Sequence, residues 1–481
     1  MGSTAVSIRA TVLEQTERTR QCSRADIEES ESKIISLNLQ ISSLIELRDS
    51  QHACVLALRH IIAPIRTLPV EVLAEIFELT IEDDTHIEDV HCISQVCSDW
   101  RLVAHDTPQL WARPLMIDLC NKMDVAGGLK TWLARSAPMP VRMSFARIDM
   151  PINGAILEEV LAVAPRSSSL QFPTVYSPPF SLVRQLAQAR LDSLEDLSLG
   201  SMDCDWLDLS FTAVPRLRKL DISNCLTTHR TLVPWAQLTD LTVGHSTPEV
   251  ILEILSQCPN LLTVSVFAPG WGRLAGLSEA NQDIVVLSHL RTLTLSFVVP
   301  SRPITSFFDY LSAPVLRDLR LWFTRAPWSQ AHFLAFQLWA QNITRLELSS
   351  RESLTSDDLG AVILHASSLT HLQFSYCNRC LNDAFIRTLY YDEGVTPLVP
   401  HLHSLVVKTE TMRFSEDVLA GMIASRWWTD TELASLEVLP VARWSSVELE
   451  FRLYHTLRDS FADVLKNIPP DVLAIKIDYE L

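Results

Sequence analysis

Three short motifs in this sequence carry residue types that could do chemistry. The segment CNRC at 377–380 has the only Cys-x-x-Cys spacing in the chain, which could suit zinc binding or thiol–disulfide exchange. The segment GWG at 270–272, with Gly276 after it, is close to a glycine-rich loop that holds a dinucleotide phosphate. The segment HLH at 401–403 could direct two imidazoles to one face of an extended strand and bind a metal.

None of these motifs has the partners that its chemistry requires. The cysteine pair lacks two further zinc ligands and a thioredoxin-like context. The third glycine lies one residue too far along for a dinucleotide loop, and two alternating histidines also suit an exposed strand edge. The sequence contains no His-Glu-x-x-His, no Gly-x-Ser-x-Gly and no P-loop. We therefore interpret the three motifs as structural and expect no enzymatic activity, no cofactor and no bound metal.

The composition argues against several classes of protein. The chain has 481 residues, of which 47% are hydrophobic, so it can bury a large core in about two to four domains or one long repeat array. Its net charge of −17 would repel a nucleic-acid backbone. No run of about 18 apolar residues occurs, so we expect no membrane span. The ten cysteines are scattered without framework spacing, which favours reduced thiols and a cytoplasmic or nuclear location.

The N-terminal part of the chain changes character after residue 26. Residues 1–26 are polar and mixed in charge, and we expect them to be disordered or loosely helical. Residues 27–63 predict a heptad-like helix, interrupted at Arg48 and Gln51, whose single apolar seam consists of Ile27, Ile34, Leu37, Ile41, Leu44, Val55, Leu58 and Ile62. Such a seam implies a partner helix, so the helix either folds back onto its own domain or self-associates through 27–62.

Residues 64–115 predict a compact helical unit. Pro69 suits the first turn of a helix whose apolar residues, between Val72 and Phe77, share one face. A second helix is expected over about 90–96, and a third begins near Ser98. Three helices in about 45 residues make a marginal core, so the unit should dock against something larger.

Ten short apolar runs repeat through the C-terminal part of the chain. Each has the form Leu-x-x-Leu-x-Leu, with Val, Ile or Phe as alternatives, and the runs begin at Leu194, Leu217, Leu238, Leu261, Leu290, Leu316, Ile343, Leu369, Leu402 and Leu433. Their middle positions are 21 to 33 residues apart, near or somewhat above the leucine-rich period of about 20–29 residues. Degenerate outer turns could lie at Val141 and Leu473. We expect the array to occupy 140–481, after a linker over 116–139.

Each unit of this array has the pattern of a strand, a turn, a helix and a loop. Alternate residues of each strand would point inward, and the segments at 246–249 and 355–358 have the pattern of capping boxes that begin helices. One unit cannot bury its own apolar face, but a stack of units can. The sequence therefore predicts an α/β fold, in which a helix and a three-helix unit precede an irregular solenoid with a parallel sheet on its concave face.

The stretch from 68 to 111 resembles an F-box. The matching residues, in order, are Leu68, Pro69, Glu71, Leu73, Ile76, Phe77, Val96, Cys97, Trp100, Arg101, Pro108, Leu110 and Trp111. Together with the preceding helix and the divergent leucine-rich region behind it, this stretch makes the chain look like the large F-box families of mushroom-forming fungi.

An F-box implies docking onto a Skp-type adaptor, and through it onto a cullin–RING ubiquitin ligase. By this resemblance, the residues that bear on the adaptor or support that surface are Leu68, Pro69, Leu73, Ile76, Val96, Cys97 and Trp100. A supporting role would fall to Glu71, Phe77, Arg101, Pro108, Leu110 and Trp111, the last of which would link the F-box to the solenoid.

The solenoid would then hold a protein substrate. The expected readers are side chains between the leucines of each strand, namely Ser198, Asp221, Thr242, Ser265, Thr294, Arg320, Glu347, Gln373 and Val406. One of the adjacent Trp427 and Trp428 could also be exposed as an interaction hot spot, although burial against the last repeats is favoured. The chain would be the substrate-recognition subunit of a ubiquitin ligase. The alternative is a non-catalytic leucine-rich scaffold acting outside a ligase.

Overall fold

The structure, a computed structural model, forms two compact units. One unit comprises Met1–Glu82 with His91–Ala104, and the other comprises Asp83–Val90 with His105–Leu481. The residues that the structure describes are 3–121, 125–146, 151–173, 178–201, 209–223, 233–268, 284–297, 308–323, 328–350, 354–392, 398–429, 433, 441–453 and 459–479.

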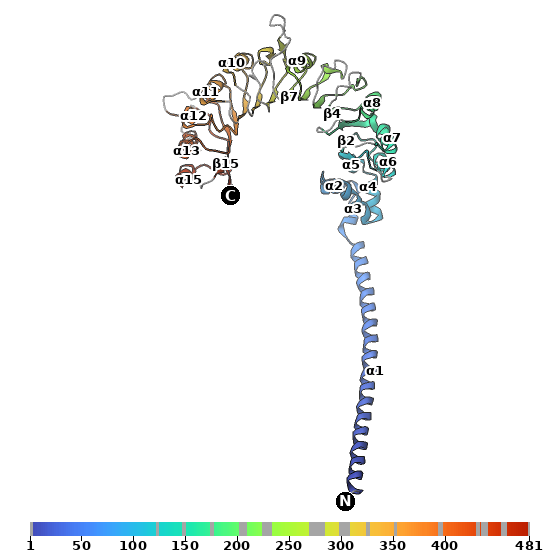
Figure 1. Ribbon diagram of the computed structural model, residues 1–481. Coiled ribbons are helices and arrows are strands. Elements are labelled where there is room, and N and C mark those ends of the chain that lie inside the picture. The colour runs from blue at the N-terminus through green and yellow to red at the C-terminus, as the bar shows by residue number, and fades with distance from the viewer. Residues whose placement is uncertain are drawn as a thin grey trace. The chain divides into compact units, whose positions relative to one another are not determined.

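The first unit begins with one long helix, α1 (Ser3–Ile61), of 59 residues (Figure 1). Residues 3–26, which we expected to be disordered or loosely helical, belong to this helix. The segment contains no glycine or proline after Gly2, and straight-chain residues such as Glu and Arg favour the helix. An ion pair one turn apart, Arg18 Nη2 to Glu14 Oε1 at 3.1 Å, adds a small local contribution.

The apolar seam of α1 is open to solvent. Every described side chain from Ala10 to Arg59 is exposed, and Ile41 at the centre of the seam is 53% accessible. The structure therefore does not show the helix folded back onto its own domain, which was one of the two expected arrangements.

Among the described residues, no single helix is long and apolar enough to cross a membrane. One bent pair, Ala10–Thr67 with Val70–Thr80, meets that standard by length and composition only.

Short helices follow α1, as the sequence predicts. They are η1 (Pro64–Thr67), α2 (Val70–Thr80), α3 (His86–Val96), α4 (Ser98–His105) and α5 (Pro108–Trp111). Pro69 stands at the N-cap of α2, directly before the first helical residue. Helix α3 begins about four residues earlier than expected. The acidic residues Glu88 and Asp89 in its first turn are favourable there, because they face the positive end of the helix dipole.

The second unit is built on a parallel sheet, which has 14 strands within the described residues. In spatial order the strands are β1 (Leu115–Ile117), β2 (Val141–Phe145), β3 (Ser167–Gln171), β4 (Asp196–Ser201), β5 (Lys219–Ser223), β6 (Asp240–Gly244), β7 (Thr263–Ala268), β9 (Thr292–Phe297), β11 (Asp318–Phe323), β12 (Arg345–Ser350), β13 (His371–Ser375), β14 (Ser404–Thr409), β15 (Ser446–Leu453) and β16 (Leu473–Tyr479). A separate two-stranded ladder joins β8 (Val285–Val286) to β10 (Leu311–Ser312). This architecture confirms the predicted leucine-rich solenoid with a parallel sheet.

Helices lie on the outer side of this sheet, so its opposite side is the inner strand face (Figure 1). The helices are α6 (Ala126–Arg135), α7 (Gly154–Val163), α8 (Phe180–Gln188), α9 (Pro248–Ser256), α10 (Gln330–Trp339), α11 (Ser356–Leu364), α12 (Asp383–Thr388), α13 (Glu416–Ser425) and α15 (Asp459–Leu465). Helix α11 begins with the predicted capping box of Thr355 and Asp358. At α9 the N-cap is Thr247 rather than Ser246, because Pro248 occupies the first helical turn directly after it.

The array begins earlier than expected. Residues 116–139, predicted to be a linker, contain most of β1 and the whole of α6. Both degenerate outer turns are strands, β2 at Val141 and β16 at Leu473. Nine of the ten predicted runs coincide with strands from β4 to β14. The tenth, starting at Leu433, lies largely outside the described residues, and the strand that pairs with β14 is β15.

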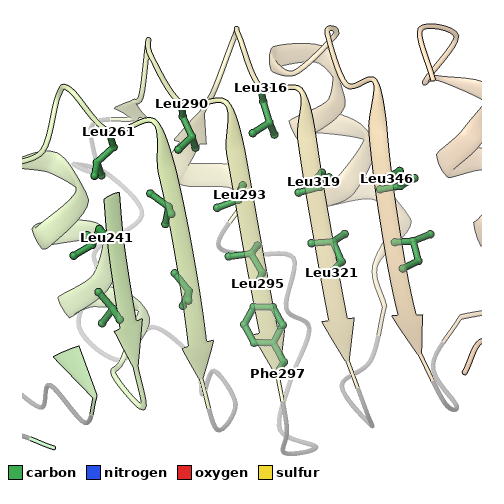
Figure 2. Packing of buried hydrophobic residues seen from close by; sticks show 14 of the residues in the cluster. Leu241, Leu261, Leu290, Leu293, Leu295, Phe297, Leu316, Leu319, Leu321 and Leu346 are labelled. Atoms are coloured by element: carbon green, nitrogen blue, oxygen red, sulfur yellow. The ribbon is translucent and has the colours of Figure 1, made fainter. Parts of the chain in front are cut away.

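Columns of leucine hold neighbouring strands to the helices. Leu293, Leu319 and Leu346 are aligned in register on β9, β11 and β12, and each is at most 2% accessible. Figure 2 shows these side chains directed to the same side of the sheet, with a second row through Leu295 and Leu321. Full burial of each leucine contributes roughly 1.5–3 kcal/mol. The repeats are therefore stabilised mainly by contacts with their nearest neighbours.

Candidate interaction surfaces

The residues expected to bear on an adaptor differ in exposure. Pro69 and Val96 are exposed, and Val96 is 58% accessible. The half-buried members are Leu68, Ile76, Cys97 and Trp100. Leu73 is only 6% accessible, so it belongs to the core beneath the surface. A partner could contact Pro69 and Val96 directly, whereas the buried Leu73 would only hold the helices that carry them in place.

An aromatic pair fixes α2 against α4. The rings of Phe77 and Trp100 lie 4.8 Å apart, and Phe77 is 1% accessible. The backbone N–H of Trp100 donates to the sulfur of Cys97 at 3.5 Å. The guanidinium of Arg101 donates to the carbonyl of Ser94 at 2.9 Å, which joins α4 to α3. The Cys-x-x-Trp-Arg motif therefore links α4 to α2 and to α3.

A second set of apolar residues in the same unit is exposed although the sequence analysis did not assign it. Val72 and Leu79 are 40% and 81% accessible, and they share one side of α2 with Ile76. Leu102 on α4 is 64% accessible. The i, i+4, i+7 spacing of Val72, Ile76 and Leu79 is the signal that could have identified the first of these surfaces. We name Pro69, Val72, Leu79 and Val96 the exposed apolar set.

The supporting residues at the end of the motif pack within the second unit. Leu110 and Trp111 are buried, and the Trp111 ring lies 4.7 Å from that of Trp132 on α6. The indole N–H of Trp132 donates to the carbonyl of Trp111 at 2.9 Å. The guanidinium of Arg135 lies 4.6 Å from the Trp111 ring centre. Trp111 is thus anchored to α6, the first helix of the repeat array. Of the other supporting residues, Pro108 is half-buried, and Glu71, which lies in the first unit, is exposed.

The nine candidate substrate readers lie side by side on the inner strand face. Register pairs join them as one continuous row, from Ser198 on β4, through Arg320 and Glu347, to Val406 on β14. Ser198 and Thr294 are buried and Arg320 is exposed, while the other six are half-buried. The row thus lies on the inner strand face, and its binding role stays a prediction.

A network of charged and polar groups occupies strands β11 to β13. Glu347 Oε1 accepts from the indole of Trp322 at 3.1 Å and from the amide of Gln373 at 3.2 Å. Its other oxygen lies 3.7 Å from Arg320 Nε. Arg345 Nε lies 3.6 Å from Asp318 Oδ1. All of these groups except Trp322 line a hollow of about 150 Å³.

A second row of side chains, two residues before the first, completes this hollow. It includes Asp318, Arg345, His371 and Ser404, none of which the sequence analysis assigned. The alternation of a strand is the signal that could have found them, because residues two apart face the same side. We name Asp318, Arg320, Arg345, Glu347, His371 and Gln373 the inner-face cluster.

His371 is held as a neutral imidazole in this cluster. Arg345 Nη2 lies 3.1 Å from His371 Nε2, and because guanidinium is only a donor, that nitrogen accepts. The Nδ1–H then donates to the hydroxyl of Thr370 at 2.8 Å. Burial, the charge of Arg345 and the neighbouring His403 all lower the pKa of His371 from its ordinary 6.5, and Asp318 opposes them. The cluster therefore presents donors and acceptors rather than an imidazolium at neutral pH.

The three motifs considered for chemistry have different outcomes. Cys377 is buried, and its thiol donates to the carbonyl of Leu348 at 3.3 Å. The glycine-rich segment at 270–276 lies outside the described residues. His403 contacts His371 with ring centres 4.7 Å apart, while His401 is exposed. Within the described ranges, no group of three or more His, Cys, Asp or Glu side chains is placed to hold a metal ion.

The adjacent tryptophans are both half-buried. The guanidinium of Arg443 lies 4.0 Å from the Trp427 ring centre. The Trp428 ring lies 5.7 Å from that of Tyr391. Both indoles thus pack against neighbouring segments but are not fully buried, and the hot-spot role of either stays a prediction.

The comparison with protein families identifies one segment. Residues 65–117 match the F-box-like family model. This match covers every residue quoted above for the F-box resemblance and confirms that resemblance. The chain thus carries an F-box-like segment followed by a leucine-rich-repeat-like parallel sheet. No curated protein matches this chain.

Solved structures include distant likenesses of the fold. A yeast complex of Rad7 and Elc1 contains a chain with 15% identity and a TM-score of 0.38, covering 76% of this chain and 94% of that one. A circular leucine-rich-repeat protein, CroV588, shows 10% identity and a TM-score of 0.27, with 71% and 47% coverage. A Bacteroides fragilis protein shows 12% identity and a TM-score of 0.26, with 64% and 71% coverage. Scores this low do not bear on function.

Proposed function

We propose that this chain is the substrate-recognition subunit of a Skp–cullin–F-box ubiquitin ligase. The observation that carries the proposal is the F-box-like match over 65–117, whose helices leave apolar side chains uncovered. A three-helix unit of this size cannot be stabilised by a large core, yet Val72, Leu79 and Val96 remain at least 40% accessible. Exposed apolar groups in so small a unit are typical of a docking site.

The repeat array would supply the substrate surface. The inner-face cluster combines two cations, two carboxylates, an imidazole and an amide around one shallow hollow. Such a mixture suits a folded protein or peptide, whose own surface presents both charges and hydrogen-bonding groups, better than a uniformly charged ligand. The ligase would gain rate by holding substrate lysines near the ubiquitin donor, so this chain need make or break no bond itself.

The second candidate is a scaffold that acts outside a ligase. The same parallel sheet with a polar inner face supports it, because solenoids of this kind bind proteins through that surface. The two candidates differ in whether the adaptor brings a cullin with it.

Co-purification of the full chain with a Skp-type adaptor and its cullin tests the proposal. We expect both partners to be retained, and Val96→Asp to lose them because a charge would have to be desolvated in the interface. Val464→Asp on α15 is the matched control, since Val464 is also exposed, at 45%. Retention of the adaptor without the cullin would favour the scaffold. Failure of the wild-type chain to retain the adaptor would overturn the ligase proposal.

A further inference from the structure

The apolar seam of α1 has no partner among the described residues. Seven of the eight seam residues lie in α1, and Ile62 directly follows its last residue. All eight are exposed, from 43% accessible at Val55 to 77% at Ile62. Helices in proteins owe most of their stability to packing of an apolar face, and none of the described contacts covers this one. A seam sustained over about five heptads is the pattern of a coiled coil.

We propose that two copies of this chain pair through α1 as a parallel, in-register, two-stranded coiled coil. The residue types along the seam carry the proposal. Every apolar residue in the a positions is β-branched, namely Ile27, Ile34, Ile41, Val55 and Ile62. Every apolar residue in the d positions is leucine, namely Leu37, Leu44 and Leu58. β-Branched residues at a with leucine at d favour the parallel dimer, because of the angle at which each side chain enters the facing helix.

The polar break in the seam fits the same arrangement. In register, Gln51 meets Gln51 of the second copy, and each amide can donate to and accept from the other. Arg48 would meet its own counterpart, but two of its nitrogens already lie 2.6 and 2.8 Å from Asp49 Oδ1. That pairing offsets the positive charge, and the long stem can pack while its head reaches solvent. A polar layer at one position also specifies the register.

A like-charge contact, which occurs once on each edge of the symmetric dimer, opposes the parallel arrangement. Asp26 in a g position and Glu31 in the following e position would face each other across the edges of the dimer. Both side chains are exposed, so their repulsion is small and is screened by salt. The dimer should therefore become tighter as ionic strength rises.

The mass of the full chain in solution tests the pairing. Sedimentation across a concentration range should show a species of about twice 54.2 kDa, and Ile41→Asp should shift it to the monomer. The matched control is Leu39→Asp, because Leu39 is 68% accessible and lies in an outer f position. A wild-type chain that stays monomeric at all concentrations would overturn the proposal. A chain that binds lipid vesicles through α1 and does not dimerise would also overturn it.

Disulfide trapping tests the direction of the helices. In a Cys22→Ser, Cys54→Ser, Cys92→Ser background, which removes the exposed thiols, Ile34→Cys should cross-link two chains under mild oxidation, because the two positions face each other in register. Leu39→Cys in the same background should not. An antiparallel pair centred between Ile41 and Leu44 would separate the two copies of residue 34 by about 25 Å, from a rise of about 1.5 Å per residue. A dimer without the Ile34→Cys cross-link would therefore contradict the parallel arrangement.

Discussion

The rings of Phe77 and Trp100 lie 4.8 Å apart and join the first and third helices of the F-box-like segment. Phe77 is buried and Trp100 half-buried, so both act beneath the candidate docking surface. A loss of either ring would alter the shape that the exposed apolar set presents. Substitutions of a buried residue and of an exposed residue on the same helix should therefore separate the effect on stability from the effect on docking.

Phe77→Ala should destabilise the helical unit by about 3–5 kcal/mol, because a large buried ring is removed and its cavity cannot fully collapse. Leu79→Ala on the same helix should change stability by less than about 0.5 kcal/mol, since Leu79 is 81% accessible. Hydrogen exchange as a function of denaturant, read on peptides from α2 and α4, measures both. Equal losses for the two variants would contradict the assignment of Phe77 to the core.

Leu348→Ala should destabilise the sheet by about 2–5 kcal/mol, because Leu348 is fully buried on β12. In a repeat array the effect should be local, so hydrogen exchange should rise most in β11, β12 and β13. Mass spectrometry of exchanged peptides would resolve this. Val315→Ala, at an exposed position between strands, serves as the control, and a uniform rise along the whole sheet would contradict nearest-neighbour stabilisation.

The pKa of His371 should lie below its ordinary 6.5, and Arg345→Gln should raise it by removing a nearby positive charge. Between the folded and unfolded pKa values the unfolded chain binds more protons, so stability rises with pH in that window. The contribution of neutral His371 to the free energy of unfolding is fully present above the pKa of the unfolded chain. It is lost as the pH falls through the pKa of the folded chain. NMR titration, with the signal assigned through His371→Gln, measures the shift. Arg320→Gln should leave it unchanged.

Cys258 should resist alkylation in the folded chain. Burial raises its pKa to about 12, so almost no thiolate exists near pH 8, and the side chain is inaccessible. Cys22, Cys54 and Cys92 are exposed and should react readily. Peptide mapping after a short iodoacetamide pulse distinguishes these sites. Rapid labelling of Cys258 without denaturant would show that α9 and β7 open more easily than their packing implies.

Leucine spacing predicted most of the sheet because each strand repeats the same burial pattern. Leu319 and Leu321 on β11 are both buried, with exposed Arg320 between them, as alternation requires. Strand β1 was missed because its three residues contain only two inward positions, Leu115 and Ile117, too short a pattern to recognise. Strand β15, which begins at Ser446, was not predicted, because its valine, leucine and phenylalanine alternate with glutamate and lack the leucine spacing of the other units.

The candidate surfaces were harder to predict than the fold. Motif order located the F-box-like segment, but it could not separate exposed Val96 from buried Leu73, because that depends on how three helices pack. The row from Ser198 to Val406 followed from strand alternation alone. The inner-face cluster required the register between strands, which brings Arg345 beside His371 although they are 26 residues apart.

The measurement that bears most directly on the proposed function is calorimetric titration of the full chain with a purified Skp-type adaptor. We expect saturable binding with a negative heat-capacity change, because apolar surface is buried. Leu79→Asp should weaken it at least about tenfold, a loss of about 1.4 kcal/mol. Leu338→Asp on α10, where the leucine is 70% accessible, should not. Absence of binding by the wild-type chain, or equal binding by Leu79→Asp, would contradict the assignment of this surface to an adaptor.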